Sequence, residues 1–224
     1  MAGRLIAIEG IDGAGKGTLA GNLIDRARRT GLRAAPMSFP RYGETRFAGL
    51  IGDYLNGGFG PLEETAPEFT AMLYAGDRYE SRTRLTDLLN ANDLVILDRY
   101  VASNMAYNAA KLPETERAGL IDWIDALEFG AYGLPRPDLT LLLDTPPQTA
   151  DGLVARKARR AYTERTRDLH EAAEGFMTTV ASVYRRLAAD RTDWCLYDPR
   201  DDAGALKPAP QVADEVWHLI ENRD

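Results

Sequence analysis

An α/β fold with a five-stranded parallel sheet and helices on both faces is the structure that this sequence predicts. Short apolar runs alternate with longer amphipathic segments, which is the pattern of parallel strands joined by covering helices. Most of the apolar runs end in Asp or Glu, where a strand would meet solvent at its carboxyl end. The five expected strands are RLIAIE (4–9), RAAPMSF (33–39), DLVILD (93–98), DLTLLLD (138–144) and DWCLYD (193–198).

The segments between these strands have the length of helices. No internal repeat, low-complexity tract or linker divides the chain, so we expect residues 1–224 to form a single domain. The stretch GLPRPD (133–138) is too short to separate two domains and is expected to lead into the fourth strand. The expected helices cover residues 16–30, 46–56, 66–91, 115–130, 168–190 and 210–222.

Composition narrows the class of protein. A hydrophobic content of 45% and a charged content of 27% are those of an ordinary globular protein, and the net charge of −7 comes without a basic block. This balance argues against a nucleic-acid partner. Cys195 is the only cysteine, so an intrachain disulfide is excluded and a reducing compartment is favoured. With neither a signal-peptide core nor a membrane-length apolar window, the sequence predicts a cytoplasmic protein without a membrane partner.

The stretch GIDGAGKGT (10–18) follows the first expected strand and opens a helix. In this context glycines let backbone N–H groups surround phosphate oxygens, and Lys16 reaches the outer phosphates. The pattern requires Ser or Thr after the lysine, but Gly17 stands there, so either Thr18 or carboxylates elsewhere would hold the magnesium of a nucleotide. The residues expected to bind ATP are Gly10, Asp12, Gly13, Ala14, Gly15, Lys16, Gly17 and Thr18.

Two further stretches follow expected strands and therefore lie at the same edge of the sheet. They are SFPRYG (38–43) and LDRYVASNMAY (97–107). Asp98 closes a buried strand near the place of a magnesium-bound phosphate, or it caps the helix that follows. Arg99 can bind a monophosphate with two hydrogen bonds, or it can form a surface ion pair.

Together with EGIDGAGKGT (9–18), YAGDRYE (74–80) and PRPDLTLLLD (135–144), these two stretches make the sequence resemble the thymidylate kinases nearly from end to end. The likeness is strongest to the actinobacterial form of this family of P-loop nucleoside monophosphate kinases. It implies ATP-dependent phosphorylation of dTMP to dTDP, with Mg²⁺ as cofactor and a homodimer as the assembly. Phosphoryl transfer of this kind needs positioning and charge neutralisation rather than a general base, because the acceptor is already a phosphate anion.

On the phosphate side, the resemblance implies that Arg41 bridges the donor and acceptor phosphates and that Tyr42 contacts the acceptor phosphate. Tyr42 can instead be a packed loop aromatic. Asp12 is implied to contact the acceptor phosphate or its magnesium. Asp168 and Glu171 match acidic positions of the actinobacterial enzymes, toward dTMP and the metal respectively, although acids also favour a helix N-terminus. At position 170 the family often has a tyrosine where this chain has histidine.

On the base side, the resemblance implies that Tyr74 stacks on thymine, with ordinary helix packing as the alternative. Arg78, one turn later on the same helix face, would reach the O4 carbonyl. Asn104 would contact the remaining amide edge, and Ser103 is included in the dTMP site. Tyr107 would lie against the sugar, where it crowds a 2′-hydroxyl.

An arginine-rich stretch, residues 155–168, lacks an apolar stripe although the protein is acidic. A solvated helix face is one explanation. The other is a lid over about residues 150–167 that closes on the phosphates. Some thymidylate kinases place a catalytic arginine where this loop has Gly13, so another source of positive charge is needed. Arg156 and Arg160 are the first candidates for this catalytic role and Arg165 the next; Arg159 and Arg167 complete the set.

Two rival functions remain from the sequence. GAGKGT also resembles adenylate kinases, although their acceptor motifs are absent here. A nucleotide-dependent switch that hydrolyses ATP slowly is the rival from another class; the Asn-Lys-x-Asp motif of regulatory GTPases is absent. Acceptor-dependent formation of ADP would separate these alternatives.

Overall fold

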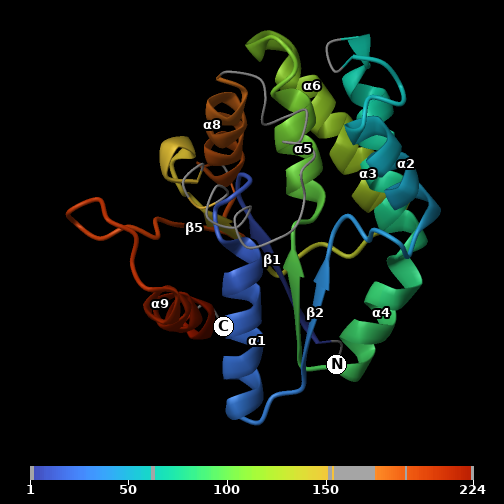
Figure 1. Ribbon diagram of the computed structural model, residues 1–224. Coiled ribbons are helices and arrows are strands. Elements are labelled where there is room, and N and C mark those ends of the chain that lie inside the picture. Colours follow the sequence, from blue (N-terminus) through green and yellow to red (C-terminus); the bar gives the residue numbers. More distant parts are fainter. Residues whose placement is uncertain (1–2, 62–63, 151–152, 154–174, 190, 223–224) are drawn as a thin grey trace.

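The computed structural model describes residues 3–61, 64–150, 153, 175–189 and 191–222. A five-stranded sheet lies at its centre, with strand order β2-β3-β1-β4-β5 and parallel pairing throughout (Figure 1). The predicted fold class and all five predicted strands are confirmed. The strands are β1 (Arg4–Glu9), β2 (Ala34–Ser38), β3 (Leu94–Asp98), β4 (Leu139–Leu143) and β5 (Trp194–Tyr197).

The register of the strands sets the position of the candidate site. Ile8 of β1 and Ser38 of β2 both pair with Asp98 of β3, so three adjacent strands end at the same level. After its first residue, β1 is buried along its whole length. The segments that follow these three strands therefore emerge together at one edge of the sheet, where ligands bind in open α/β folds.

Helices cover both faces of the sheet, as right-handed crossovers between parallel strands require. In Figure 1, α1 and α9 lie together on one face, and α5 packs beside α8 on the other. The helices are α1 (Lys16–Arg29), α2 (Arg46–Leu55), α3 (Pro67–Glu80), α4 (Arg82–Ala91), α5 (Val101–Ala109), α6 (Glu114–Asp125), a π-helical turn η2 (Ala126–Ala131), α8 (Phe176–Ala189) and α9 (Ala209–Glu221).

The single helix predicted over 66–91 is wrong, because α3 ends at Glu80 and α4 begins at Arg82. The hydroxyl of Ser81 donates to the carbonyl oxygen of Asp77 at 2.7 Å, and the Ser81 amide is shared between the carbonyls of Asp77 and Arg78. Such local hydrogen bonds bend or interrupt helices. The break turns Ser81 toward the site.

Helix α5 is not among the helix ranges predicted above, and a helix was expected here only as the one that Asp98 would cap. Its buried apolar residues Val101, Met105 and Ala109 recur every fourth position, which is the spacing of one helix face. The short length of this helix and its position directly behind a strand concealed this period. Helix α5 carries Ser103, Asn104 and Tyr107, so three residues predicted for the dTMP site lie on one short helix.

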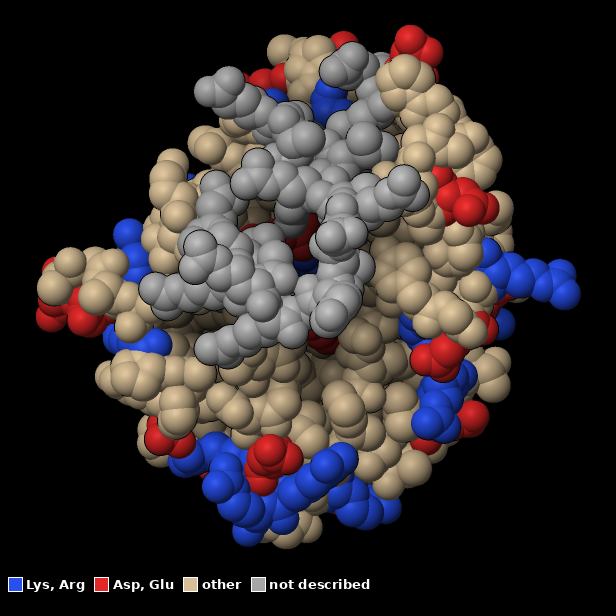
Figure 2. Space-filling model, viewed as in Figure 1, with Lys and Arg blue, Asp and Glu red and all other residues tan. Residues whose placement is uncertain are grey.

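The charged surface is mixed, and Lys and Arg side chains gather at the lower end in Figure 2, where α1 ends. The last turn of α1 contributes Arg26, Arg28 and Arg29. Cations at a helix carboxyl terminus are stabilised by the helix dipole, so this cluster needs no ligand to explain it. In the described part of the chain, no helix is long and apolar enough to cross a membrane.

Candidate active site

The glycine-rich loop connects β1 to α1 at the carboxyl edge of the sheet. Gly10, Gly13 and Gly15 adopt φ angles of 143°, 79° and 98°, a region that favours glycine. A Cβ at Gly10 would lie 2.7 Å from the carbonyl oxygen of Leu143. The loop therefore depends on glycine for its path as well as for the exposed N–H groups that bind anions.

Lys16, the first residue of α1, is buried and bends back over its own loop. Its Nζ donates to the carbonyl oxygen of Ile11 at 2.8 Å. Burial, and secondarily the charge of Arg99, lowers the pKa of Lys16 to about 8, while Asp12 and Asp98 act in the opposite direction. The ammonium group thus lies against the loop and, in the described part of the chain, donates to one protein acceptor.

Arg99, directly after β3, joins the loop to α5. It has a φ of 68°, unusual for a residue other than glycine, which often marks a functional site. Its guanidinium forms an ion pair with Asp12 and lies 5.3 Å from the centre of the Tyr107 ring. Tyr107 in turn donates to Asp12 Oδ2 at 2.8 Å. Although burial opposes it, Asp12 raises the pKa of Arg99 well above its usual value.

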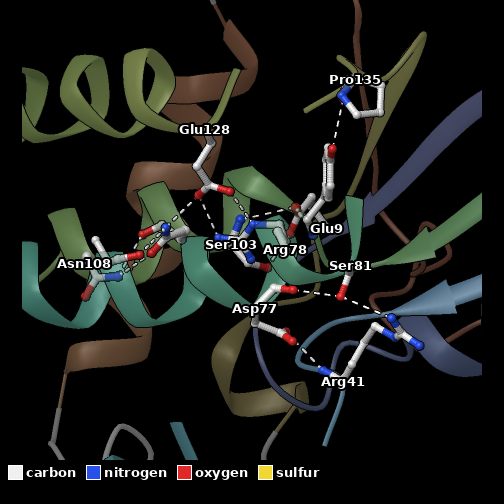
Figure 3. Close-up of polar contacts among 12 residues, drawn as sticks. Glu9, Arg41, Asp77, Arg78, Ser81, Ser103, Asn108, Glu128 and Pro135 are labelled. Atoms are coloured by element: carbon white, nitrogen blue, oxygen red, sulfur yellow. Dashed lines mark hydrogen bonds and ion pairs between the residues drawn. The ribbon is translucent and has the colours of Figure 1, made fainter. Parts of the chain in front are cut away.

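Glu9 holds α5 against the end of β1, a role that was not predicted from the sequence. The fully buried carboxylate accepts from the backbone amides of Tyr100 and Ser103 at 2.8 and 3.2 Å and from the hydroxyls of Ser103 and Tyr184 at 2.5 and 3.0 Å (Figure 3). The only signal in the sequence is a carboxylate that ends a buried strand beside the loop. Glu9 thereby fixes the distance between the loop and the polar face of α5.

A buried ion pair lies at the far end of the same site. Arg78 on α3 binds the carboxylate of Glu128 with both Nε and Nη2, and the two side chains are 2% and 0% exposed (Figure 3). Asn104 donates to the same carboxylate at 2.7 Å. Glu128 was not predicted as a site residue, and it reaches inward from the π-helical turn η2, an irregularity common at functional sites.

Arg41 follows β2 and is held by the helix break described above. Its backbone amide donates to Asp77 Oδ2 at 3.0 Å, and its Nη1 donates to the Ser81 hydroxyl at 3.3 Å (Figure 3). Burial raises the pKa of Asp77, although Thr45 and Arg41 donate hydrogen bonds to it. Arg41 also pairs with Glu44. Asp77 therefore holds the backbone of Arg41, and two residues, Ser81 and Glu44, orient its side chain.

Asp98, the last residue of β3, has a buried carboxylate oxygen that needs a hydrogen-bond partner or a cation. Its Oδ1 is buried and, within the described residues, has no hydrogen-bond partner. A Cβ at Gly17 would lie 3.0 Å from Oδ2 of Asp98, so the position where the loop pattern requires Ser or Thr faces this carboxylate. Thr18, the alternative metal contact, is exposed at the start of α1.

Two cavities meet at this edge of the sheet. The larger, about 670 Å³, lies beside α1 and α4 and is lined by Gly17, Arg41 and Arg84 among others. The second, about 370 Å³, extends from the glycine-rich loop to the buried ion pair. Tyr42, 55% exposed, and Asp98 line both cavities. The second cavity brings together the residues predicted for dTMP that the structure describes, namely Asp12, Tyr42, Tyr74, Arg78, Arg99, Ser103, Asn104 and Tyr107.

Lys111, just beyond α5, is partly buried beside this site and has no carboxylate partner within the described residues. Its Nζ donates to Tyr54, Thr70 and Asn108, and burial lowers its pKa to about 7. Between pH 7 and about 10.5, Lys111 keeps its proton in the unfolded chain but has lost it in the folded protein. The free energy of unfolding therefore rises with pH across this window.

We therefore expect Lys111→Met to reduce the gain in free energy of unfolding between pH 6.5 and pH 9 by on the order of 1–2 kcal/mol. Urea unfolding at the two pH values measures this gain. Lys207→Met is the control, since Glu215 raises the pKa of Lys207 and moves it out of the window. An unchanged gain in Lys111→Met would show that Lys111 keeps its proton in the folded protein.

Comparison with known proteins identifies the family. The family model described as thymidylate kinase matches residues 8–206. A thymidylate kinase of Mycobacterium tuberculosis is 39% identical over 185 residues, which cover 83% of this chain and 86% of that protein.

The chain belongs to the thymidylate kinase family.

Other thymidylate kinases agree over nearly the whole chain. A probable thymidylate kinase of Archaeoglobus fulgidus is 29% identical and the match covers 97% of this chain and 95% of the relative. The solved structure of thymidylate kinase from Candida albicans, described with an origin of broad substrate specificity, superposes with a TM-score of 0.72 at 25% identity, covering 99% of this chain and 92% of that one. The predicted family, its actinobacterial likeness and its kinase activity, ATP-dependent phosphorylation of dTMP to dTDP, are confirmed.

Several residues predicted for the site lie outside the described part of this chain. They are Arg156, Arg159, Arg160, Arg165, Arg167, Asp168, His170 and Glu171, together with most of the lid predicted over 150–167. In the described part, no three His, Cys, Asp or Glu side chains form a metal-binding group. The predicted roles of the site residues remain predictions.

Proposed function

We propose that this chain transfers the terminal phosphate of ATP to dTMP, bound in the 370 Å³ cavity. The observation that carries this proposal is the polarity of that cavity. One end has the Asp12–Arg99 pair beside the phosphate-binding loop, and the other has Arg78 and Asn104 over a buried carboxylate. A nucleoside monophosphate has the same polarity, with an anion at one end and a hydrogen-bonding base at the other.

At the phosphate end, three cations have distinct roles. Lys16 binds the outer phosphates of ATP and exchanges its bond to Ile11 for phosphate oxygens. Arg99 binds the dTMP phosphate, and Arg41 stands between the two nucleotides. Their charges neutralise the phosphoryl group during transfer, which is the main requirement of this reaction. Tyr42 donates to the acceptor phosphate.

The residues present fit Mg²⁺, which binds proteins through one or two carboxylates and takes its other ligands from water and phosphate. Asp98 offers a buried oxygen with no partner among the described residues, and Asp12 lines the same cavity. When bound, Mg²⁺ would offset phosphate charge. We propose Asp12 and Glu171 as its carboxylates, with Asp98 supporting it from the end of β3.

At the base end, Tyr74 supplies a flat surface for thymine, Arg78 donates to O4, and Asn104 contacts the ring nitrogen beside it. Tyr107 is held by Asp12 and by the Arg99 guanidinium over its ring, which places a rigid phenol between the phosphate and base ends. A rigid ring there would crowd a 2′-hydroxyl and favour deoxyribose.

The arginine-rich segment is proposed, from the sequence, to act as a lid over the phosphates within the single domain 1–224. Replacing Arg156, Arg160 or Arg165 singly with alanine is expected to lower kcat by about 10–10³-fold with little change in dTMP affinity, because the lost contact forms mainly in the transition state. Steady-state kinetics and calorimetric titration with dTMP measure the two effects. Undiminished kcat after alanine replacement at all five arginines, Arg159 and Arg167 included, would leave the segment as a solvated helix face.

We also propose a cytoplasmic homodimer, without nucleic-acid or membrane partners. Large apolar side chains stand exposed on the packed helices α2 and α3, among them Leu50 at 38% and Met72 at 43% exposure. Burying them against a second copy would remove this apolar surface from water. Sedimentation velocity tests the proposal by the mass of the species in solution.

The experiment that tests the function is ADP formation with a set of monophosphates: dTMP, dCMP, AMP and none. We expect dTMP alone to give fast ADP release. Fast release with AMP would instead support an adenylate kinase, and release that is slow and independent of acceptor would support a nucleotide switch.

A further inference from the structure

A directional chain of hydrogen bonds runs beneath the base end of the cavity. Lys111 Nζ donates to Asn108 Oδ1 at 2.9 Å, Asn108 Nδ2 donates to Asn104 Oδ1 at 2.7 Å, and Asn104 Nδ2 donates to Glu128 Oε1 at 2.7 Å. In each of these bonds the donor nitrogen lies on the Lys111 side and the acceptor oxygen on the Glu128 side. Asn104, Asn108 and Glu128 are 2%, 1% and 0% exposed, so water does not compete for these groups.

The carboxylate end of the chain determines its direction. A carboxylate only accepts hydrogen bonds. Glu128 can therefore face only the nitrogen of Asn104, whose second hydrogen goes to the carbonyl oxygen of Ala71 at 3.0 Å. At the other end Lys111 Nζ donates to Asn108 Oδ1, which leaves Asn108 Nδ2 facing the Asn104 oxygen. A reversed Asn104 amide would set its oxygen against two acceptors, and unpaired buried polar groups are costly.

This arrangement leaves a defined pair of groups for a ligand. Both hydrogens of Asn104 Nδ2 are used within the protein, but its Oδ1 can accept one more bond. Arg78 uses Nε and Nη2 on Glu128, and Nη1 has no hydrogen bond to the described residues. Both side chains line the cavity. The site thus offers a donor from Arg78 beside an acceptor from Asn104.

We propose that Glu128, Asn108 and Lys111 are positioning residues that fix the Asn104 oxygen toward the substrate base and so select thymine and uracil over cytosine. Thymine presents the O4 acceptor beside the N3–H donor, whereas cytosine presents an amino group beside a bare ring nitrogen, so both of its contacts are mismatched. A reversed Asn104 amide would suit the cytosine ring nitrogen. This inference rests on the proposed function, in which Arg78 and Asn104 contact the base.

The test is Asn108→Asp, which keeps the size of the side chain and its bond to Lys111 but sets an acceptor against the Asn104 oxygen. We expect the ratio of kcat/KM for dTMP to that for dCMP to fall at least about tenfold, mainly through KM of the monophosphate. Efficiency with dUMP should fall in parallel with dTMP, because the two bases share this edge, and KM for ATP should not change. Asn92→Asp, the same change at the end of α4 outside the cavity, is the control.

Asn108→Leu removes the donor without adding an acceptor, so Glu128 and Ala71 still hold the Asn104 amide. The ratio of kcat/KM for dTMP to that for dCMP in this variant should lie between the ratios of wild type and Asn108→Asp. If the aspartate variant does not fold, Asn108→Leu provides the test. A ratio that stays within about twofold of wild type in the folded variants would overturn the inference. Failure of the wild-type protein to phosphorylate dTMP would instead overturn the proposed function.

Discussion

Replacing Lys16 with methionine is expected to lower kcat by about 10²-fold or more while the protein stays folded. The ammonium group lies at the phosphate loop and, among the described residues, its one hydrogen bond is to the carbonyl oxygen of Ile11. Burial already disfavours its charge, as the lowered pKa of about 8 indicates, so an apolar side chain of similar length costs the fold little. Coupled ADP release and urea unfolding measure the two quantities.

Lys207→Met serves as the matched control for this experiment. Lys207 is also engaged in hydrogen bonds, to Glu215, but belongs to the segment before α9 and lines neither cavity. It should keep normal turnover. Near-normal turnover in Lys16→Met would mean that the glycine-rich loop does not bind the donor phosphates as proposed.

The second large effect concerns Arg78. Arg78→Met leaves Glu128 buried without its cation, which we expect to lower the free energy of unfolding by about 3–5 kcal/mol. The double variant Arg78→Met/Glu128→Met removes both charges and should recover most of this stability. Binding of dTMP should nevertheless remain weak in the double variant, because the donor to O4 is missing. Binding of ATP should be close to normal in both.

Urea unfolding gives the stabilities, and isothermal titration gives the two affinities. If the double variant recovers stability and dTMP affinity together, Arg78 acts only as a structural partner of Glu128. An equal loss of dTMP and ATP affinity in the double variant would also count against a role in binding the base.

Periodicity and local motifs were sufficient for the sheet and the phosphate loop. Each strand is a short apolar run in which burial decides the structure, and Gly10 to Lys16 form one contiguous pattern whose chemistry needs no distant partner. Arg99 and Asn104 could be placed near this loop because they follow a strand that had to end at the same edge. Chain order and sheet geometry together carry that inference.

Glu9 and Glu128 could not be found in this way. Both are fully buried carboxylates whose role depends on partners far along the chain, since Glu9 binds Ser103 and Tyr184, and Glu128 binds Arg78. In sequence, Glu128 is an ordinary acid in a helical segment, and only the π-helical turn directs it inward. The break at Ser81 was missed for the related reason that a serine within a helical pattern carries no signal of its own.

The fate of the terminal phosphate of ATP distinguishes transfer to dTMP from hydrolysis. The wild-type protein is incubated with ATP labelled at the γ-phosphate, Mg²⁺ and dTMP, and the products are separated. We expect the label to appear in dTDP in a one-to-one ratio with the ADP formed, with little inorganic phosphate. Label found chiefly in inorganic phosphate, at a rate that dTMP does not change, would contradict transfer to dTMP.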